Sequence, residues 1–164
     1  MPEMKKQINI KLILLESVAL IFLINGLQRL YMASQGLKYD ALLNENWDKF
    51  KSLTSESLGD FFAMRAFWTL GFISFGIIAI GVINWKKGVA IINSIILFII
   101  ILGVTMTGFF LSGITNNYLN YFCGIFTENY GTSFFVGGNI LTIIGIVILW
   151  KTINLNKNTI HNTV

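Results

Sequence analysis

Four long apolar segments constrain the fold of this chain more than any other feature. They lie at about residues 10–31, 58–84, 89–111 and 133–150. Each is long enough to cross the hydrocarbon core of a bilayer as a helix, which takes roughly 17–25 residues. A helix also satisfies its own backbone hydrogen bonds in lipid. We therefore predict an all-α integral membrane protein, a four-helix bundle that forms a single domain over residues 1–164.

The composition agrees with a lipid environment. The chain is 54% hydrophobic and 12% charged, with a mean hydropathy of +0.68, whereas soluble domains carry about 25% charged residues. The net charge is +4, but the lysines are spread over tails and loops, which argues against nucleic-acid binding. With one Cys, Cys123, and one His, His161, we predict neither an intrachain disulfide nor a Cys/His metal site. We expect Cys123 to be a small apolar filler.

The distribution of lysine predicts the orientation of the four segments. One side of the membrane receives Lys5, Lys6, Lys11, Lys86, Lys87, Lys151 and Lys157. The loop at 112–132 has no Lys or Arg, and the loop at 32–60 carries more acidic than basic residues. Positive loops stay in the cytoplasm. We therefore predict a multi-pass protein of a bacterial inner membrane with both termini cytoplasmic and the first segment retained.

The first outer loop is predicted to hold an amphipathic helix. Leu43, Trp47 and Phe50 recur at helical spacing, and Asp40 is a candidate N-cap. We interpret residues 40–53 as an interfacial helix that lies in the headgroup plane. The alternative is a loop without regular structure.

Local motifs mark the ends of the other segments. Ser57 and Asp60 have the spacing of a capping box ahead of the second segment. Residues 85–88, Trp-Lys-Lys-Gly, are typical of a tight turn at the interface. Residues 112–132 are rich in Asn, Tyr and Phe, and we interpret them as a loop with an interfacial aromatic belt.

Polar side chains recur at one depth in all four segments. A rise of about 1.5 Å per residue places both Arg29 and Arg65 about 12 Å outside the midplane. The same half holds Asn25, Gln28, Thr105, Thr107 and Asn139. We predict an outward-facing pocket whose ligand-binding candidates are Asn25, Gln28, Arg29, Arg65, Thr105 and Asn139.

Two guanidinium groups would suit an anionic headgroup, a quinone carbonyl or a small anion, because Arg binds carboxylate and phosphate in a bidentate manner. Under the alternative, both Arg side chains reach the headgroups or pair with Glu56 and Asp60. Asn25 and Asn139 would then bridge helices.

Glu16 is an acidic residue within the first segment. It shares a helical face with Leu20, Leu23, Leu27 and Leu30, opposite Asn25 and Arg29. An ion pair with Arg29 is therefore not expected. Four alternatives remain for Glu16: protonation, a partner at Asn93 or Ser94, contact with a second protomer, or a position at the inner interface.

Spacings of small residues predict close helix packing. Gly103 and Thr107 form one such pair, and Gly138 and Thr142 form another, with Gly145 on the face of the second. Catalytic signatures are not found: the sequence has no Ser/His/Asp set, Cys/His pair, P-loop or dinucleotide fingerprint. An enzyme acting on lipid substrates is the alternative kept on this point.

The end of the first segment resembles the DoxX-like family of four-span membrane proteins. In that family an apolar run leads to Gly and then to a basic residue followed by apolar ones, as at Gly26, Arg29 and Leu30. The long first outer loop and the basic turn at 85–88 are also similar. The chain differs at residues 16–17, where the family pattern has Arg and Gly. The resemblance implies a small membrane subunit, in some members associated with quinone-linked sulfur oxidation.

Glu16 is similarly placed to the membrane-embedded Glu of the small multidrug resistance family, although the loop at 32–60 is longer here. Our leading prediction is a non-enzymatic accessory or interaction subunit, or a bundle that binds a lipid or a quinone. It would have no tightly bound cofactor and would contact lipid and either a membrane protein partner or a second copy. The alternative is a proton-coupled small-molecule exporter that uses Glu16 in a homodimer.

Overall fold

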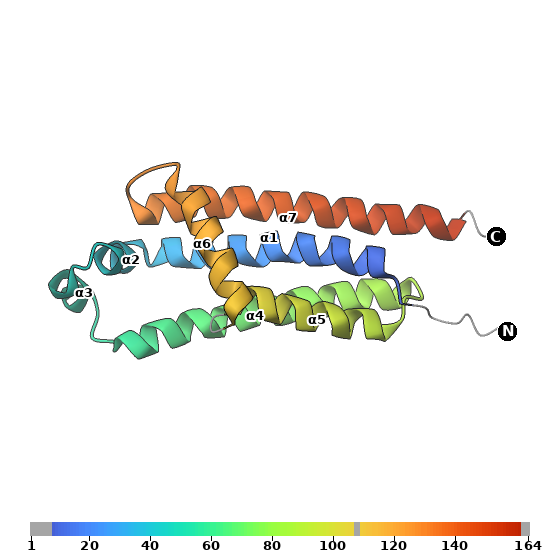
Figure 1. The fold of residues 1–164 in the computed structure, drawn as a ribbon, viewed down its shortest axis with the longest axis horizontal. Helices are drawn as coiled ribbons and strands as arrows, with labels where there is room; N and C mark the ends of the chain where they lie inside the picture. Colours follow the sequence, from blue (N-terminus) through green and yellow to red (C-terminus); the bar gives the residue numbers. More distant parts are fainter. Residues whose placement is uncertain (1–7, 107–108, 162–164) are drawn as a thin grey trace.

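The computed structural model describes residues 8–106 and 109–161, with side chains described as far as residue 154. Within these ranges the chain forms helices and no strands (Figure 1). The helices are α1 (Ile10–Ser34), α2 (Gly36–Leu43), α3 (Trp47–Leu53), α4 (Leu58–Lys86), α5 (Ile91–Thr105), α6 (Phe110–Gly124) and α7 (Tyr130–His161). The all-α prediction is confirmed.

Three of these helices are long and apolar enough to cross a membrane. They are α1, α4 and the part of α7 from Tyr130 to Asn154, and together they are typical of an α-helical membrane protein. The predicted third segment at 89–111 is too long. Its helix, α5, is apolar but has 15 residues, or about 22 Å, against a hydrocarbon core of about 30 Å. Extended backbone at Met106 and Phe109 separates α5 from α6.

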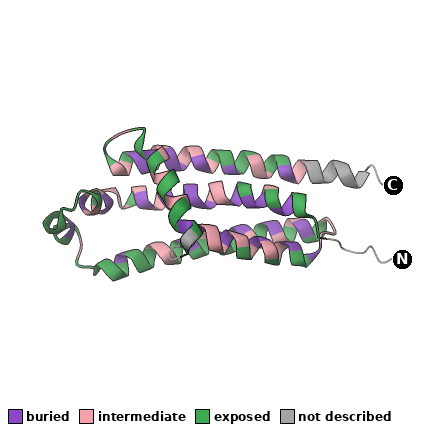
Figure 2. Ribbon diagram, in the orientation of Figure 1, coloured by how far each residue is buried: buried purple, intermediate pink, exposed green. Residues whose placement is uncertain are grey.

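Helix α1 lies at the centre of the molecule. Helix α7 runs antiparallel to α1 along one side of it, while α4 and α5 pack on the other side of α1. Helix α6 runs steeply across the bundle between α5 and α7 (Figure 1). Buried residues follow α1, while much of α4 is exposed (Figure 2). The Leu20 side of α1 packs against buried apolar residues of α4 and α5: Ile73, Ile80, Leu97 and Ile101. Both faces of α1 are therefore inside.

Small residues bring α1 and α7 into direct backbone contact. A Cβ atom added to Gly138 would lie 3.0 Å from the carbonyl oxygen of Gly26, and one added to Gly26 would lie 2.6 Å from the backbone nitrogen of Thr142. Gly145 is equally close to the backbone of Leu23. The predicted packing role of the second small-residue pair is confirmed, and its partner is α1.

The first small-residue pair is not confirmed as a packing motif. A Cβ atom added to Gly103 would meet no atom of the described residues within 4 Å. Thr107 lies outside the described residues. Within the described part of the chain, Gly103 therefore has no close neighbour on another helix.

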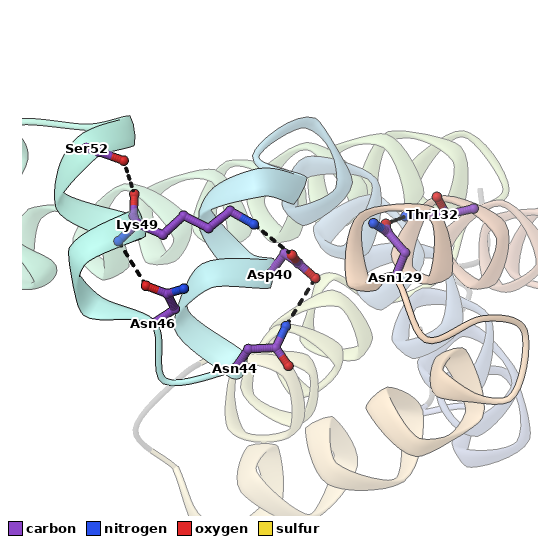
Figure 3. A network of polar contacts seen from close by, with 7 residues as sticks. All are labelled: Asp40, Asn44, Asn46, Lys49, Ser52, Asn129 and Thr132. Carbon is purple, nitrogen blue, oxygen red and sulfur yellow. Dashed lines mark hydrogen bonds and ion pairs between the residues drawn. The ribbon is translucent and has the colours of Figure 1, made fainter.

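The prediction of one continuous helix over residues 40–53 is wrong. The region forms two short helices, α2 and α3, because Glu45 has a positive φ of 56°. Asp40 lies within α2, and the N-cap of α3 is Asn46, whose Oδ1 accepts from the Lys49 backbone N–H at 3.0 Å. Figure 3 shows Asp40 bound to Asn44 and Lys49 across the break.

Helices α2 and α3 cover the end of the bundle. Tyr39 of α2 and Phe50 of α3 are buried, and both pack against Phe61 of α4. Tyr39 also packs against Phe134 of α7. The ring centroids of Tyr39 and Phe61 are 4.9 Å apart. This aromatic cluster fixes the position of Tyr39 above the ends of α1 and α4.

Two predicted end motifs are confirmed. The Ser57 hydroxyl accepts from the Asp60 backbone N–H at 3.1 Å and donates to the Asp60 carboxylate at 2.6 Å, and α4 begins at Leu58. Gly88 ends the turn after α4 with a φ of 74°, and its N–H donates to the Trp85 carbonyl.

Candidate functional site

The candidate site forms at the end of α1 that lies beneath α2. Asn25, Gln28 and Arg29 are all buried there, and Arg29 is 0% exposed. The Arg29 Nη1 donates to the Asn25 backbone carbonyl at 3.2 Å and to Asn25 Oδ1 at 3.3 Å. The spacing of four residues along one helical face allows this pair to meet. The Asn25 side chain thus supports Arg29 rather than bridging two helices.

Helix α6 supplies the other oxygen atoms that bind Arg29. The Arg29 Nη2 donates to Asn120 Oδ1 at 2.8 Å and to the Asn116 backbone carbonyl at 3.3 Å. The prediction of a loop over residues 112–132 is therefore wrong over α6. Aromatic and polar composition suggested a loop at the interface, but the polar residues form one side of a helix.

The spacing of residues along α6 contains the signal that was missed. Ser112, Asn116, Asn120 and Cys123 recur at helical spacing and lie on the covered side, with Cys123 next to Arg29. The opposite side is exposed, with Tyr118 74% and Tyr121 78% exposed. This periodicity identifies an amphipathic helix.

Arg65 reaches the same cluster from α4. Its Nη2 donates to Asn116 Oδ1 at 3.4 Å, so Asn116 contacts both guanidinium groups. One turn further along α4, the Thr69 hydroxyl donates to the Arg65 carbonyl and accepts from Gln28 Nε2 at 2.8 Å. The matching depths of Arg29 and Arg65 in the sequence correspond to this meeting in space.

The two guanidinium groups have no carboxylate partner among the described residues. The ion pairs there join Lys38 to Glu56 at 3.3 Å and Lys49 to Asp40 at 3.4 Å. The alternative in which the Arg29 side chain extends out of the bundle to the headgroup layer is wrong, because Arg29 is fully buried. Two positive charges are therefore held together by neutral oxygen atoms.

Several polar atoms of this cluster are buried without a hydrogen-bond partner among the residues that the structure describes. They are Nε of Arg29, Nε of Arg65, Oε1 of Gln28 and the hydroxyl of Tyr39. Burial raises the pKa of Tyr39 to about 12, and the nearby Arg65 partly opposes this. Buried polar groups in proteins nearly always have partners. Three of these atoms are donors, and they lie in the same cluster as the two positive charges.

Among the described residues, two predicted members make hydrogen bonds within their own helices only. The Thr105 hydroxyl donates to the Ile101 carbonyl at 2.7 Å, and Asn139 Nδ2 donates to the Phe135 carbonyl at 2.8 Å. Asn139 therefore makes no hydrogen bond that bridges two helices. Within the described residues, the predicted set gathers at Asn25, Gln28, Arg29 and Arg65.

Glu16 lies in a second polar cluster at the other end of α1. It is 2% exposed, and its two carboxylate oxygens accept from Asn84 Nδ2 at 2.9 and 3.1 Å. Lys87, just beyond Asn84, lies close enough to interact electrostatically with it. The expected partners Asn93 and Ser94 bond or pack elsewhere. Glu16 thus finds its partner within its own chain, at the end of α4.

A separate surface pocket of about 440 Å³ lies where α1 meets α2. Its lining includes Gly36, Lys38, Leu53, Asn129 and Thr132, and Figure 3 shows the last two beside α2. The lining does not include Arg29, Arg65 or their hydrogen-bond partners. This pocket is therefore distinct from the arginine cluster.

The fold and the cluster define a class of protein. It is an α-helical protein of membrane type that holds two neighbouring guanidinium groups at one end of its bundle. The chain matches no protein-family model, no curated protein and no solved structure. The resemblance to the DoxX-like family stays a prediction.

Proposed function

We propose that this protein is a four-span bacterial inner-membrane protein of DoxX-like type that binds the polar head of a lipid or a quinone. It acts as an accessory or interaction subunit and performs no catalysis. One observation carries the proposal: Arg29 is fully buried and shares Asn116 with Arg65, and neither forms an ion pair within the described ranges. A buried cation without an anionic partner is costly, and within a membrane-type helix it marks a functional site by default.

The arrangement of the helices supports four crossings. Helices α1, α4 and α7 are long enough individually, and we assign the fourth crossing to α5 followed by α6. The start of α1 and the end of α7 lie at the same end of the molecule (Figure 1), as an even number of crossings requires. Lys11, Lys86 and Lys151 belong to that end, which the positive-inside rule places in the cytoplasm.

Arg29→Ala combined with Arg65→Ala tests the proposal. The variant and the wild type are purified in mild detergent, and the bound lipids and quinones are extracted and quantified by mass spectrometry. A control variant with Lys86→Ala and Lys151→Ala removes the same charge from exposed positions at the opposite end. We expect one species of lipid or quinone to be lost from the arginine variant alone.

Circular dichroism is used to check that both variants remain helical. If the arginine variant retains the same lipids and quinones in the same amounts, the proposed binding function is wrong. Loss of one species from both variants would indicate binding by net charge, which also contradicts the proposal.

A proton-coupled exporter remains the second candidate, because Glu16 is a buried carboxylate in a membrane-type helix. The apolar residues between the two clusters favour the first candidate. Leu20, Ile24 and Ile73 fill this region and are at most 1% exposed, so no polar path joins Glu16 to Arg29 there. Transport measured with Glu16→Gln distinguishes the two, since an exporter would lose proton-coupled transport.

A further inference from the structure

The charge of the arginine cluster restricts what its ligand can be. Arg29 and Arg65 contribute two positive charges, while the oxygens that contact them belong to the neutral amides of Asn25, Asn116 and Asn120. A neutral ligand such as a quinone would add a hydrogen-bond acceptor but leave both charges uncompensated. A buried cation is best compensated by a hydrogen-bonded negative charge.

The unused donors suit an anion with several oxygen atoms. Among the described residues, neither Nε atom of the two guanidinium groups has an acceptor, and neither does the hydroxyl proton of Tyr39, whose oxygen interacts with Arg65. The edge of a guanidinium group that includes Nε can bind carboxylate or phosphate oxygens in a bidentate manner. A phosphate group offers enough oxygen atoms for donors from both Arg side chains and from Tyr39.

The depth of the cluster and its surroundings indicate a lipid rather than a free anion. Arg29 precedes the end of α1 by about 8 Å, and Arg65 follows the start of α4 by about 10 Å. Near Arg65, α4 exposes Phe62, Phe67 and Trp68, which can contact acyl chains. Exposed Tyr118 and Tyr121 of α6 are typical of the headgroup level.

We infer that the ligand is an anionic phospholipid of the outer leaflet, whose phosphate binds between Arg29 and Arg65 while its acyl chains lie along α4. This inference rests on the proposed function and narrows it to one ligand class. It adds Tyr39 and Asn116 as residues that position the phosphate and the two guanidinium groups.

Thermal unfolding in nonionic detergent tests the inference. Four probes are added in turn: short-chain phosphatidylglycerol, short-chain phosphatidylcholine, inorganic phosphate and a short-chain ubiquinone. We expect phosphatidylglycerol alone to raise the melting temperature in a saturable manner. Arg65→Ala should weaken this effect at least tenfold, and Tyr39→Phe severalfold, because each removes a donor to the phosphate. Lys86→Ala should leave it unchanged.

The other outcomes separate this inference from the proposed function. If ubiquinone alone stabilises the protein and Arg65→Ala abolishes this effect, the phospholipid is not the ligand but the proposed binding site stands. If inorganic phosphate stabilises the protein as much as phosphatidylglycerol does, the ligand is a free anion and not a lipid. An unchanged response to phosphatidylglycerol in Arg65→Ala would overturn the inference. Should Arg65→Ala fail to fold, Arg65→Lys keeps the charge and removes the bidentate edge, and its unchanged affinity would contradict the geometry.

Discussion

The contact between α1 and α7 makes a quantitative prediction for Gly26→Ala. The added Cβ atom would lie 2.6 Å from the backbone nitrogen of Thr142 and 2.9 Å from the carbonyl oxygen of Gly138, whereas ordinary contact begins at 3.4 Å. Both atoms belong to a helical backbone and cannot rotate away. Helices α1 and α7 would therefore have to separate by about 0.8 Å at this point, which loosens a closely packed interface.

Gly103→Ala is the matched control, because it adds the same methyl group to an apolar helix where no atom of the described residues lies within 4 Å. Ala favours a helix over Gly by about 1 kcal/mol in both variants, so this contribution cancels in the comparison. The difference in the free energy of unfolding then isolates the cost of overpacking, which is about 1–3 kcal/mol. Because the clash at Gly26 is with backbone, we expect a value near 3 kcal/mol, the upper end of this range.

The assay is reversible unfolding in mixed micelles, in which the denaturing detergent fraction is raised and helicity is followed by circular dichroism. Gly26→Ala should unfold at a lower fraction than the wild type, and Gly103→Ala at an equal or higher one. Equal stability of the two variants would refute the close approach of α1 and α7.

Three further predictions follow from particular residues. Asn84→Ala should lower the free energy of unfolding by about 1–3 kcal/mol, because the buried Glu16 carboxylate loses its hydrogen-bond donors. If Asn84→Ala lowers the free energy of unfolding equally in a Glu16→Gln background, Asn84 and Glu16 do not interact. The raised pKa of Tyr39, about 12 against 10, contributes stability that is fully present below pH 10 and lost as the pH rises towards 12. Tyr39→Phe should flatten the plot of unfolding free energy against pH between pH 10 and 12. An unchanged slope of this plot would contradict the raised pKa of Tyr39. In intact cells, a membrane-impermeant maleimide should label Glu128→Cys but not the buried Cys123; labelling of Glu128→Cys only after lysis would reverse the orientation.

The meeting of Arg29 and Arg65 could be predicted from the sequence because the rise of a helix is constant. Counting residues from the ends of two neighbouring apolar segments gives Arg29 and Arg65 similar depths, and these depths agree with their shared contact with Asn116 in the fold. Rotation about the helix axis is not fixed in this way. It depends on which helices are neighbours, so the contacts of Thr105 and Asn139 within their own helices could not be foreseen.

The composition of residues 112–132 predicts a loop, whereas the periodicity of their polar residues indicates the helix α6. Asn, Tyr and Phe are common at a membrane interface, yet Asn116 and Asn120 are four residues apart, and Tyr118 and Tyr121 lie on the other side. The partner of Glu16 was missed for a different reason. The sequence offers Asn93 or Ser94 of the third segment, whereas α4 also packs against the Leu20 side of α1 and brings Asn84 to Glu16.

Helix α1 joins two polar clusters of different character through an apolar middle. At one end the carboxylate of Glu16 is bound by Asn84, so both of its oxygens accept a hydrogen bond from within the chain. At the other end Arg29 and Arg65 keep unused donors and an uncompensated charge. Substitutions at the Glu16 end should therefore lower stability equally with and without lipid. Substitutions of Arg65 should instead remove the lipid-dependent part of the stability, and the reverse pattern would assign the binding site to Glu16.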